Sequence, residues 1–173
     1  MLILVVASRI FLVNESSAQQ KELQTVSARF SLSVSIPDAA VKVGAPIWVI
    51  VTKENTSDQN LSVYRAIAGD SDQGGWVYRV IAQDEKGRKA PKTKFGRHVQ
   101  GPETADEAIE PASMVGSGGY IPLAPHKSIS DRINIGKLYD LTHAGKYTVQ
   151  VQEFDEESKT YVKSNPITVT VTP

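Results

Sequence analysis

The chain has 173 residues, of which 40% are hydrophobic and 22% charged, so it is long and apolar enough to form a folded domain. Its 19 basic and 19 acidic residues leave no net charge, so no overall field attracts nucleic acid or an anionic membrane. The sequence contains no cysteine, which excludes disulfide bonds and the lipid anchor of bacterial lipoproteins. A folded domain must therefore be stabilised by its core.

The N-terminal segment has the composition of a secretory signal peptide. Residues 2–7 form an apolar run, and Ser16 and Ala18 place small residues where a signal peptidase reads them. We expect a signal peptide over residues 1–18 and a flexible N-terminus over residues 19–27. The apolar run is too short to span a bilayer, so no stable membrane insertion is expected after cleavage. The expected location is the bacterial periplasm or exterior; the alternative for this segment is an N-terminal strand or anchor.

Short segments of alternating apolar and polar residues follow along the chain. Residues 30–36 alternate strictly and predict the first strand, because period-two alternation places one set of side chains on a buried face. Turn-forming residues separate it from further predicted strands at 47–53, 61–67, 76–83, 126–135, 147–151 and 167–171. The pattern predicts an all-β, antiparallel two-sheet sandwich of about seven strands, in one domain over residues 28–173.

One long irregular loop interrupts this pattern between residues 92 and 119. A short helix is predicted at 103–109, and a single helical turn at 137–140 is expected to cross between the sheets. Loops of this length without strands are uncommon in compact domains and are often functional or mobile.

Trp48 and Ile50 lie on the opposite face of their predicted strand from Val49 and Val51. A strand that is apolar on both faces is either covered or forms a contact surface. Two hypotheses follow. Either the loop 92–119 covers Trp48 and Ile50, or these residues bind a partner protein or a second copy of the chain.

The segment from Leu141 to Tyr147 precedes the penultimate predicted strand and reads Leu-x-x-x-Gly-x-Tyr. It is similar to the corner of immunoglobulin and fibronectin type III domains, where a Tyr hydroxyl bonds to the backbone a few residues upstream. The resemblance implies an immunoglobulin-like sandwich in which Leu141, Gly145 and Tyr147 have a structural role.

Residues 28–173 resemble the exported immunoglobulin-like proteins of bacteria and, more distantly, the BsuPI-type proteinase-inhibitor domain. Two segments carry this resemblance, residues 44–57 and residues 139–166. It implies an exported, non-catalytic binding or interaction module, whose partner is an unknown protein or a cell-envelope ligand. Because sandwich folds host many functions, the ligand does not follow from the fold.

The alternative function is peptidase inhibition through loops at one end of the sandwich. The Gly-rich loop of chagasin-like inhibitors of cysteine peptidases is similar to four residues here, Gly116, Ser117, Gly118 and Gly119. The Arg-Pro-Trp motif of those inhibitors has no match, and an acidic segment takes its place. An inhibitor is expected to bring three segments together at one end, namely 55–60, 116–119 and 154–159.

Catalytic, metal and cofactor sites are not indicated. The three histidines, His98, His126 and His143, stand singly and not at metal-ligand spacing. Asp70 and Asp72 open a segment with the rhythm of a calcium loop, but its twelfth position is not the Glu that such a loop needs. We therefore assign no catalytic, metal or cofactor residue and expect no enzyme activity.

One cluster of basic residues lies between Lys86 and His98 and could bind an anionic polymer. The following segment carries four acidic residues between Glu103 and Glu110. We expect these opposite charges to neutralise each other within one loop, so no nucleic-acid partner is predicted.

Overall fold

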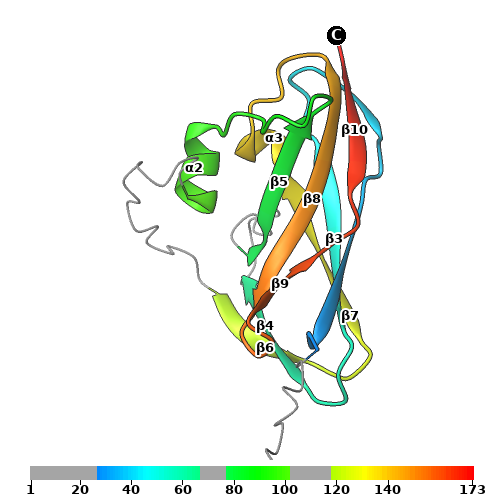
Figure 1. The fold of residues 1–173 in the computed structure, drawn as a ribbon, viewed down its shortest axis with the longest axis vertical. Helices are drawn as coiled ribbons and strands as arrows, with labels where there is room; N and C mark the ends of the chain where they lie inside the picture. Colours follow the sequence, from blue (N-terminus) through cyan, green and yellow to red (C-terminus); the bar gives the residue numbers. More distant parts are fainter. Residues whose placement is uncertain (1–26, 67–76, 102–117) are drawn as a thin grey trace, which may run out of the picture.

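The alternating segments form the strands of two facing sheets (Figure 1). The computed structural model describes residues 27–66, 77–101 and 118–173. Its strands are β1 (Phe30–Ser35), β2 (Ala40–Lys42), β3 (Trp48–Asn55), β4 (Leu61–Ala66), β5 (Arg79–Asp84), β6 (Gly118–Leu123), β7 (Ser128–Asn134), β8 (Gly145–Asp155), β9 (Thr160–Lys163) and β10 (Ile167–Thr172). The described helices are α2 (Lys94–Gln100) and α3 (Ile135–Leu138), and neither is long and apolar enough to cross a membrane.

The strands are arranged as two sheets and a ribbon. The first sheet has the order β1-β3-β7 and is antiparallel throughout. The second has the order β2-β10-β8-β5, with β9 paired to the far half of β8, and only its β2–β10 pairing is parallel among the described strands. β4 and β6 form the ribbon, which lies away from the C-terminus in Figure 1. The prediction of an immunoglobulin-like antiparallel sandwich is confirmed.

Inward-facing side chains of the two sheets form the core. Val49 and Val51 on β3, and Val149 and Val151 on β8, have no exposed surface. Each such burial contributes about 1.5–3 kcal/mol, which offsets the entropy lost on ordering the chain. Thr148, which alternates with the buried residues of β8, remains exposed. The period-two pattern therefore sets both the strands and the face that they bury.

The described residues contain ten strands, where the sequence predicts about seven. β6 escapes prediction because Gly118, Gly119 and Pro122 all disfavour a strand. Among the described strands β6 pairs with β4 alone, and at such an edge a proline need not cost a ladder hydrogen bond.

The returning strand of the C-terminal hairpin is also divided, into β9 and β10. Asn165 and Pro166 separate the two parts. At the break the backbone N–H of Val151 donates to the Ser164 hydroxyl oxygen at 3.0 Å. The side chain of Ser164 thus satisfies a buried amide that a continuous strand would bond through its backbone.

β5 begins at Arg79, where its pairing with Gln152 of β8 starts; the predicted start at residue 76 lies outside the described residues. β5 ends in the predicted turn, where Gly87 has the positive φ (74°) that glycine tolerates.

The described part of the irregular loop contains α2, which was not predicted, while the helix predicted at 103–109 lies outside the described residues. Thr93 caps α2, since its hydroxyl oxygen accepts a hydrogen bond from the Gly96 amide at 2.9 Å. Gly96 packs directly on α3: a Cβ added there would lie 1.8 Å from the carbonyl oxygen of Leu138. Tertiary contact therefore holds this helix of seven residues, which is too short to be stable alone.

α3 is the helical turn expected at 137–140, but it starts two residues earlier, at Ile135. The cause is Asn134, whose side-chain oxygen accepts from the Gly136 amide at 3.1 Å and from the Ile47 amide at 3.2 Å. Asn134 therefore caps the helix and joins it to the start of β3.

Two side-chain amides bond to the outer edges of the sheets. On β5, Gln100 donates to the carbonyl of Tyr78 and accepts from the amide of Val80, both at 2.8 Å. On β1, Asn165 donates to the carbonyl of Val34 and accepts from its amide, both at 2.9 Å. Each side chain occupies the place of a residue in a neighbouring strand and satisfies edge groups that would otherwise be open.

The corner before β8 is held by Tyr147. Its side chain is buried, and its hydroxyl donates to the carbonyl of His143, four residues upstream, at 2.9 Å. Leu141, at the start of the same segment, is buried in the core. This is the contact that the sequence predicts for such a corner.

We predict that Tyr147→Phe lowers the free energy of unfolding by about 1 kcal/mol, because the His143 carbonyl loses its donor. Chemical denaturation measures the change. Tyr120→Phe is the matched control, because the Tyr120 side chain is 73% exposed, and it should unfold like the wild type. Identical midpoints for both variants would contradict a stabilising corner.

Candidate functional site

The interior of the sandwich changes from apolar to polar toward one end. Beyond Val51 and Val151, the next inward positions are Lys53 on β3 and Glu153 on β8. Their side chains form an ion pair between the sheets, with Nζ 2.6 Å from Oε1. Lys53 is 4% exposed, and its Nζ also lies 4.1 Å from the centroid of the Phe30 ring. The pair is therefore packed inside the sandwich.

A second polar contact lies in the same layer. The Tyr78 hydroxyl donates to Asp131 Oδ2, on β7, at 2.8 Å. Burial first, and then the charge of Asp131, raises the pKa of Tyr78 far above its ordinary value, so this hydroxyl remains a neutral donor. Burial also raises the pKa of Glu153, and the neighbouring Lys53 only partly opposes the shift. No described residue bonds to Glu153 Oε2, which is buried.

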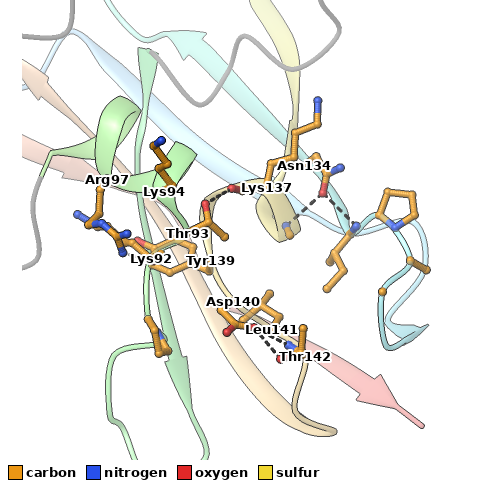
Figure 2. A pocket seen from close by; sticks show the side chains of 16 residues that line it. Lys92, Thr93, Lys94, Arg97, Asn134, Lys137, Tyr139, Asp140, Leu141 and Thr142 are labelled. Atoms are coloured by element: carbon orange, nitrogen blue, oxygen red, sulfur yellow. Dashed lines mark hydrogen bonds between the residues drawn. The ribbon is translucent and has the colours of Figure 1, made fainter.

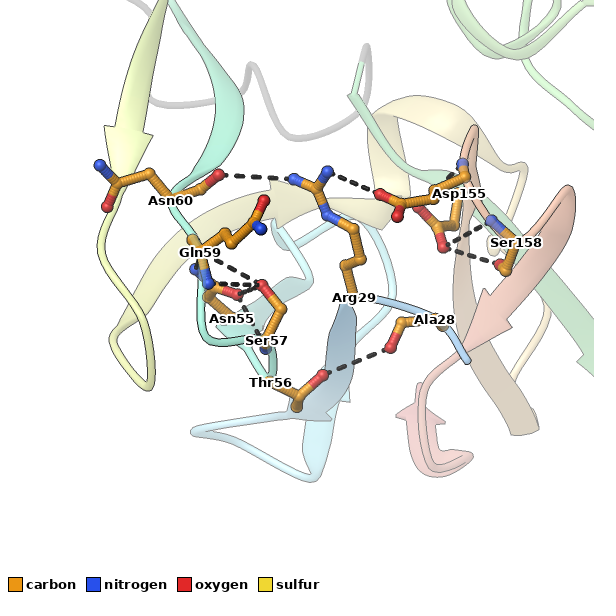
Figure 3. A network of polar contacts seen from close by, with 10 residues as sticks. Ala28, Arg29, Asn55, Thr56, Ser57, Gln59, Asn60, Asp155 and Ser158 are labelled. Atoms are coloured by element: carbon orange, nitrogen blue, oxygen red, sulfur yellow. Dashed lines mark hydrogen bonds and ion pairs between the residues drawn. The ribbon is translucent and has the colours of Figure 1, made fainter. Parts of the chain in front are cut away.

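Two connecting segments meet at this end of the sandwich, residues 55–60 between β3 and β4 and residues 155–159 between β8 and β9 (Figure 3). Arg29 joins them: Nη1 donates to Glu157 Oε2 at 2.7 Å, and Nη2 donates to the carbonyl of Asn60 at 3.5 Å. We call Arg29 and these two segments the loop end. The structure thus brings together two of the three segments that an inhibitor is expected to present.

Asn55 fixes the first segment from inside. Its side chain is fully buried, and its amide nitrogen donates to the carbonyls of Gln59 at 2.7 Å and Leu123 at 2.8 Å. Its side-chain oxygen accepts from the amide and the hydroxyl of Ser57, at 3.0 and 2.8 Å. Four hydrogen bonds from one residue hold segment 55–60 in a single shape, which a plain surface turn would not have.

Asp155 has the corresponding role in the second segment. Its Oδ2 accepts from the Ser158 amide at 3.2 Å and from the Ser158 hydroxyl at 2.7 Å. Burial raises the pKa of Asp155, but these bonds, with those from the backbone amides of Glu157 and Arg29, hold the pKa below its ordinary value. The carboxylate is therefore ionised and orders the hairpin.

Backbone strain also collects here. Lys159, in the hairpin, and His126, just before β7, have φ values of 54° and 56°, in the left-handed region that favours glycine. The ring of His126 contacts Asp58, with Nε2 3.3 Å from Oδ1, so this residue adjoins segment 55–60. Strain of this kind persists only where surrounding structure enforces it, and it clusters at functional sites.

Two aromatic pairs flank the loop end. Tyr64 on β4 and Tyr120 on β6 pack edge to face with ring centroids 5.6 Å apart, and Phe154 on β8 and Tyr161 on β9 do the same at 5.2 Å. Tyr120 is 73% exposed, Tyr161 49% and Phe154 39%. We call these four residues the aromatic pairs. Sequence reasoning missed them, although Phe154 stands among the outward Thr and Gln residues of β8, which is a legible signal.

The structure places Trp48 and Ile50 on the outer face of the first sheet, where both are half-buried. Arg132 of the neighbouring β7 lies over the Trp48 ring, 4.5 Å from its centroid. The described part of the irregular loop bonds to β5 and packs on α3 instead. The remainder of the proposed cover, residues 102–117, lies outside the described residues.

The structure describes only two of the four residues of the Gly-rich loop. Gly116 and Ser117 lie outside the described residues, whereas Gly118 and Gly119 begin β6, opposite Ala66 and Arg65. The prediction of a loop is wrong for these two glycines, because β4 supplies their backbone with strand partners. They also lie at the far end of the ribbon from Leu61, which adjoins the loop end.

The opposite end of the sandwich has a groove of about 530 Å³. It is lined by Gly44–Ile47, by residues 91–94 and by Tyr139–Thr142, together with the helix residues Arg97 and Lys137 (Figure 2). Three residues of the predicted basic cluster, Lys92, Lys94 and Arg97, therefore line the groove. Another member of that cluster, Arg88, instead pairs with Asp84 in the turn after β5, at 2.6 Å.

The histidines lie on separate elements: His98 is in α2, His126 precedes β7 and His143 precedes β8. Within residues 27–66, 77–101 and 118–173 no three His, Cys, Asp or Glu side chains are grouped to hold a metal ion. The segment with calcium-loop rhythm, residues 70–74, falls outside these ranges.

No protein-family model matches the sequence, and neither does any curated protein. Among solved structures the fold is similar to the CARDB domain of a Pyrococcus furiosus protein in complex with di-metal ions, with 12% sequence identity and a TM-score of 0.44. The match covers 84% of this chain and 89% of that chain. It is also similar to a β-glucosidase from Listeria innocua in complex with glucose, at 14% identity and a TM-score of 0.40, over 84% of this chain and 16% of the glucosidase. These likenesses concern the fold alone.

We predict that Lys53→Met destabilises the domain by about 3 kcal/mol at neutral pH, because it leaves the Glu153 carboxylate buried and unpaired. Since the pKa of Glu153 is already raised, its ionisation costs stability as pH rises. The destabilisation should therefore shrink as pH falls through the raised pKa of Glu153 toward the ordinary carboxyl value of about 4.3, because the protonated side chain carries no unpaired charge. Denaturation across this range measures the change.

The control for this prediction is Lys159→Met. It removes a pair with Glu156 whose two side chains are 70% and 82% exposed, and such pairs contribute little. A loss of stability in Lys53→Met that does not vary with pH would contradict the role given to Glu153.

Proposed function

We propose that this protein is an exported, non-catalytic interaction module that binds a protein partner through its loop end and aromatic pairs. The observation that carries the proposal is the exposure of two edge-to-face aromatic pairs on strands that adjoin ordered loops. Tyr and Phe are enriched at the buried centres of protein interfaces, and Tyr is among the residues that carry most of the binding energy there.

The order of the loop end supports this proposal. Asn55 and Asp155 fix the two segments from within, and Arg29 ties them together, so little loop entropy is left to lose on binding. A surface that is already in its bound shape binds more tightly than a flexible one of equal area. Charged residues at the hairpin, Glu156, Glu157 and Lys159, would form a polar rim around the aromatic centre.

Export is part of the proposal and rests on the composition of residues 1–18, which predicts a signal peptide. The partner is accordingly expected in the periplasm or outside the cell. The test must distinguish this protein partner from the alternative, a cell-envelope ligand that is not a protein.

We predict that a photo-crosslinking residue at position 120 or 161 captures the same partner protein, whereas one at position 52 does not. Tyr120 and Tyr161 belong to the two aromatic pairs, and Thr52 lies on the outer face of the first sheet. Tyr120→Ser with Tyr161→Ser should abolish affinity capture of that partner. Equal capture by the wild type and this double variant would contradict the proposed surface, and loss of binding to a protein-free envelope fraction would identify the alternative ligand.

Peptidase inhibition is the second candidate function. It is favoured by one observation, the bridging of segments 55–60 and 155–159 by Arg29, since inhibitory sandwiches insert several end loops into one cleft. The acidic hairpin would suit a peptidase with a basic rim.

For this second candidate we expect no inhibition of papain-like peptidases, because the Arg-Pro-Trp motif is absent. A panel of cysteine and serine peptidases assayed with the protein measures the outcome. Inhibition that is lost in Arg29→Gln, and kept in Arg132→Gln on the outer face of the first sheet, would favour the inhibitor over the interaction module.

A further inference from the structure

The groove at the α2 and α3 end concentrates positive charge in a chain that has none overall. Its lining residues include four cations, Lys92, Lys94, Arg97 and Lys137, and one anion, Asp140 (Figure 2). The surplus is notable because the 19 basic and 19 acidic residues of the whole chain balance. A concave surface with an excess of one charge raises the local concentration of small ions of the opposite charge.

Local contacts fix the direction of two of these cations. Lys92 donates from Nζ to the carbonyl of Gly101 at 2.7 Å, at the end of α2. Arg97 donates from Nη1 to the carbonyl of Lys92, also at 2.7 Å. A guanidinium carries five N–H donors in a planar fork, so Arg97 keeps most of its donors for a further acceptor.

Lys94 stands three residues before Arg97 on α2, so the two side chains lie on neighbouring positions of one helix surface. Both are exposed. The planar fork of the Arg97 guanidinium matches the two oxygens of a carboxylate or phosphate, and Lys94 adds a second positive charge to the same groove lining.

The opposite wall of the groove carries the carboxylate of Asp140. Its Oδ1 accepts from the Thr142 hydroxyl at 2.7 Å and from the Thr142 amide at 3.2 Å. These bonds hold the pKa of Asp140 below its ordinary value, so the group is ionised. A ligand that lies across the groove would meet an acceptor here, while Pro46 and Pro91 on the lining supply apolar contact.

We propose that this groove binds a small organic oxyanion, a carboxylate or a phosphate ester, that also carries a hydroxyl or amine donor. Lys94 and Arg97 bind the oxyanion, and Asp140 accepts from the donor group. The volume of about 530 Å³ suits a ligand of this size. This site is separate from the loop end, so the test of this proposal is independent of the test of the proposed function.

The test uses the full chain and three probes: citrate, glycerol 3-phosphate, and tricarballylate, which is citrate without its hydroxyl group. Calorimetry gives the affinities, and NMR amide shifts locate the site. We expect saturable binding of citrate or glycerol 3-phosphate with shifts at residues 92–97 and 140–142, and weaker binding of tricarballylate. Whether citrate or the phosphate ester binds better decides between the two oxyanions.

Lys94→Gln with Arg97→Gln should weaken citrate binding about tenfold or more, the loss expected for one or two charge-assisted hydrogen bonds. Lys86→Gln, which removes a cation outside the groove lining, is the matched control and should change it less than about twofold. Asp140→Asn keeps the acceptor that bonds to Thr142, so the turn should fold, and it should reduce the preference for citrate over tricarballylate.

Three results would overturn the proposal. The first is the absence of saturable binding at about 10 mM of every probe, a concentration that detects even weak sites. The second is an equal loss of binding in Lys86→Gln, which would indicate general attraction of anions. The third is an unchanged preference for citrate over tricarballylate in Asp140→Asn, which would mean that Asp140 does not accept from the hydroxyl group of the ligand.

Discussion

The ion pair between Lys53 and Glu153 sets how the two sheets face each other. A buried charge is tolerated only opposite its partner, so sliding β3 along β8 by two residues, about 6.6 Å, would place either Lys53 or Glu153 against a valine. Asn55 and Asp155 each lie two residues beyond the pair. The same constraint therefore places the two loops that they order next to each other at one end of the sandwich. Arg29 can then reach both segments. The loop end thus depends on a contact made inside the sandwich.

Much of the fold could be predicted from the sequence, because the alternation in β1, β8 and β10 encodes both strand and buried face. What could not be predicted depends on tertiary contact. β6 is a strand because β4 pairs with it, in spite of Gly118 and Pro122, and α2 is a helix because Gly96 packs against the Leu138 carbonyl. Neither partner is close in sequence, so local propensity gives the wrong or no answer for these segments.

The candidate site, like the fold, could be predicted from the sequence only in part. The two segments 55–60 and 154–159 could be selected from their turn composition, but their meeting through Arg29 joins residues 128 positions apart, which no spacing reveals. The predicted contact residues Trp48 and Ile50 lie on a sheet face of their own, where Arg132 lies over the Trp48 ring. For the aromatic pairs, the sequence shows only aromatic residues at outward positions and not which of them pair. Whether such residues are exposed or covered is decided by the other layers of the fold.

The amide of Asn165 that bonds to the edge of β1 also bears on the chemical ageing of the protein. Asparagine side chains deamidate when the following backbone nitrogen attacks the side-chain carbonyl and closes a ring. Here the following residue is Pro166, whose nitrogen carries no hydrogen to release, so this ring closure is blocked. Conversion to aspartate would remove the donor to the Val34 carbonyl and place a negative charge beside it. The order Asn-Pro thus protects, in a chain without cysteine, a residue whose slow chemical loss would open the edge of β1.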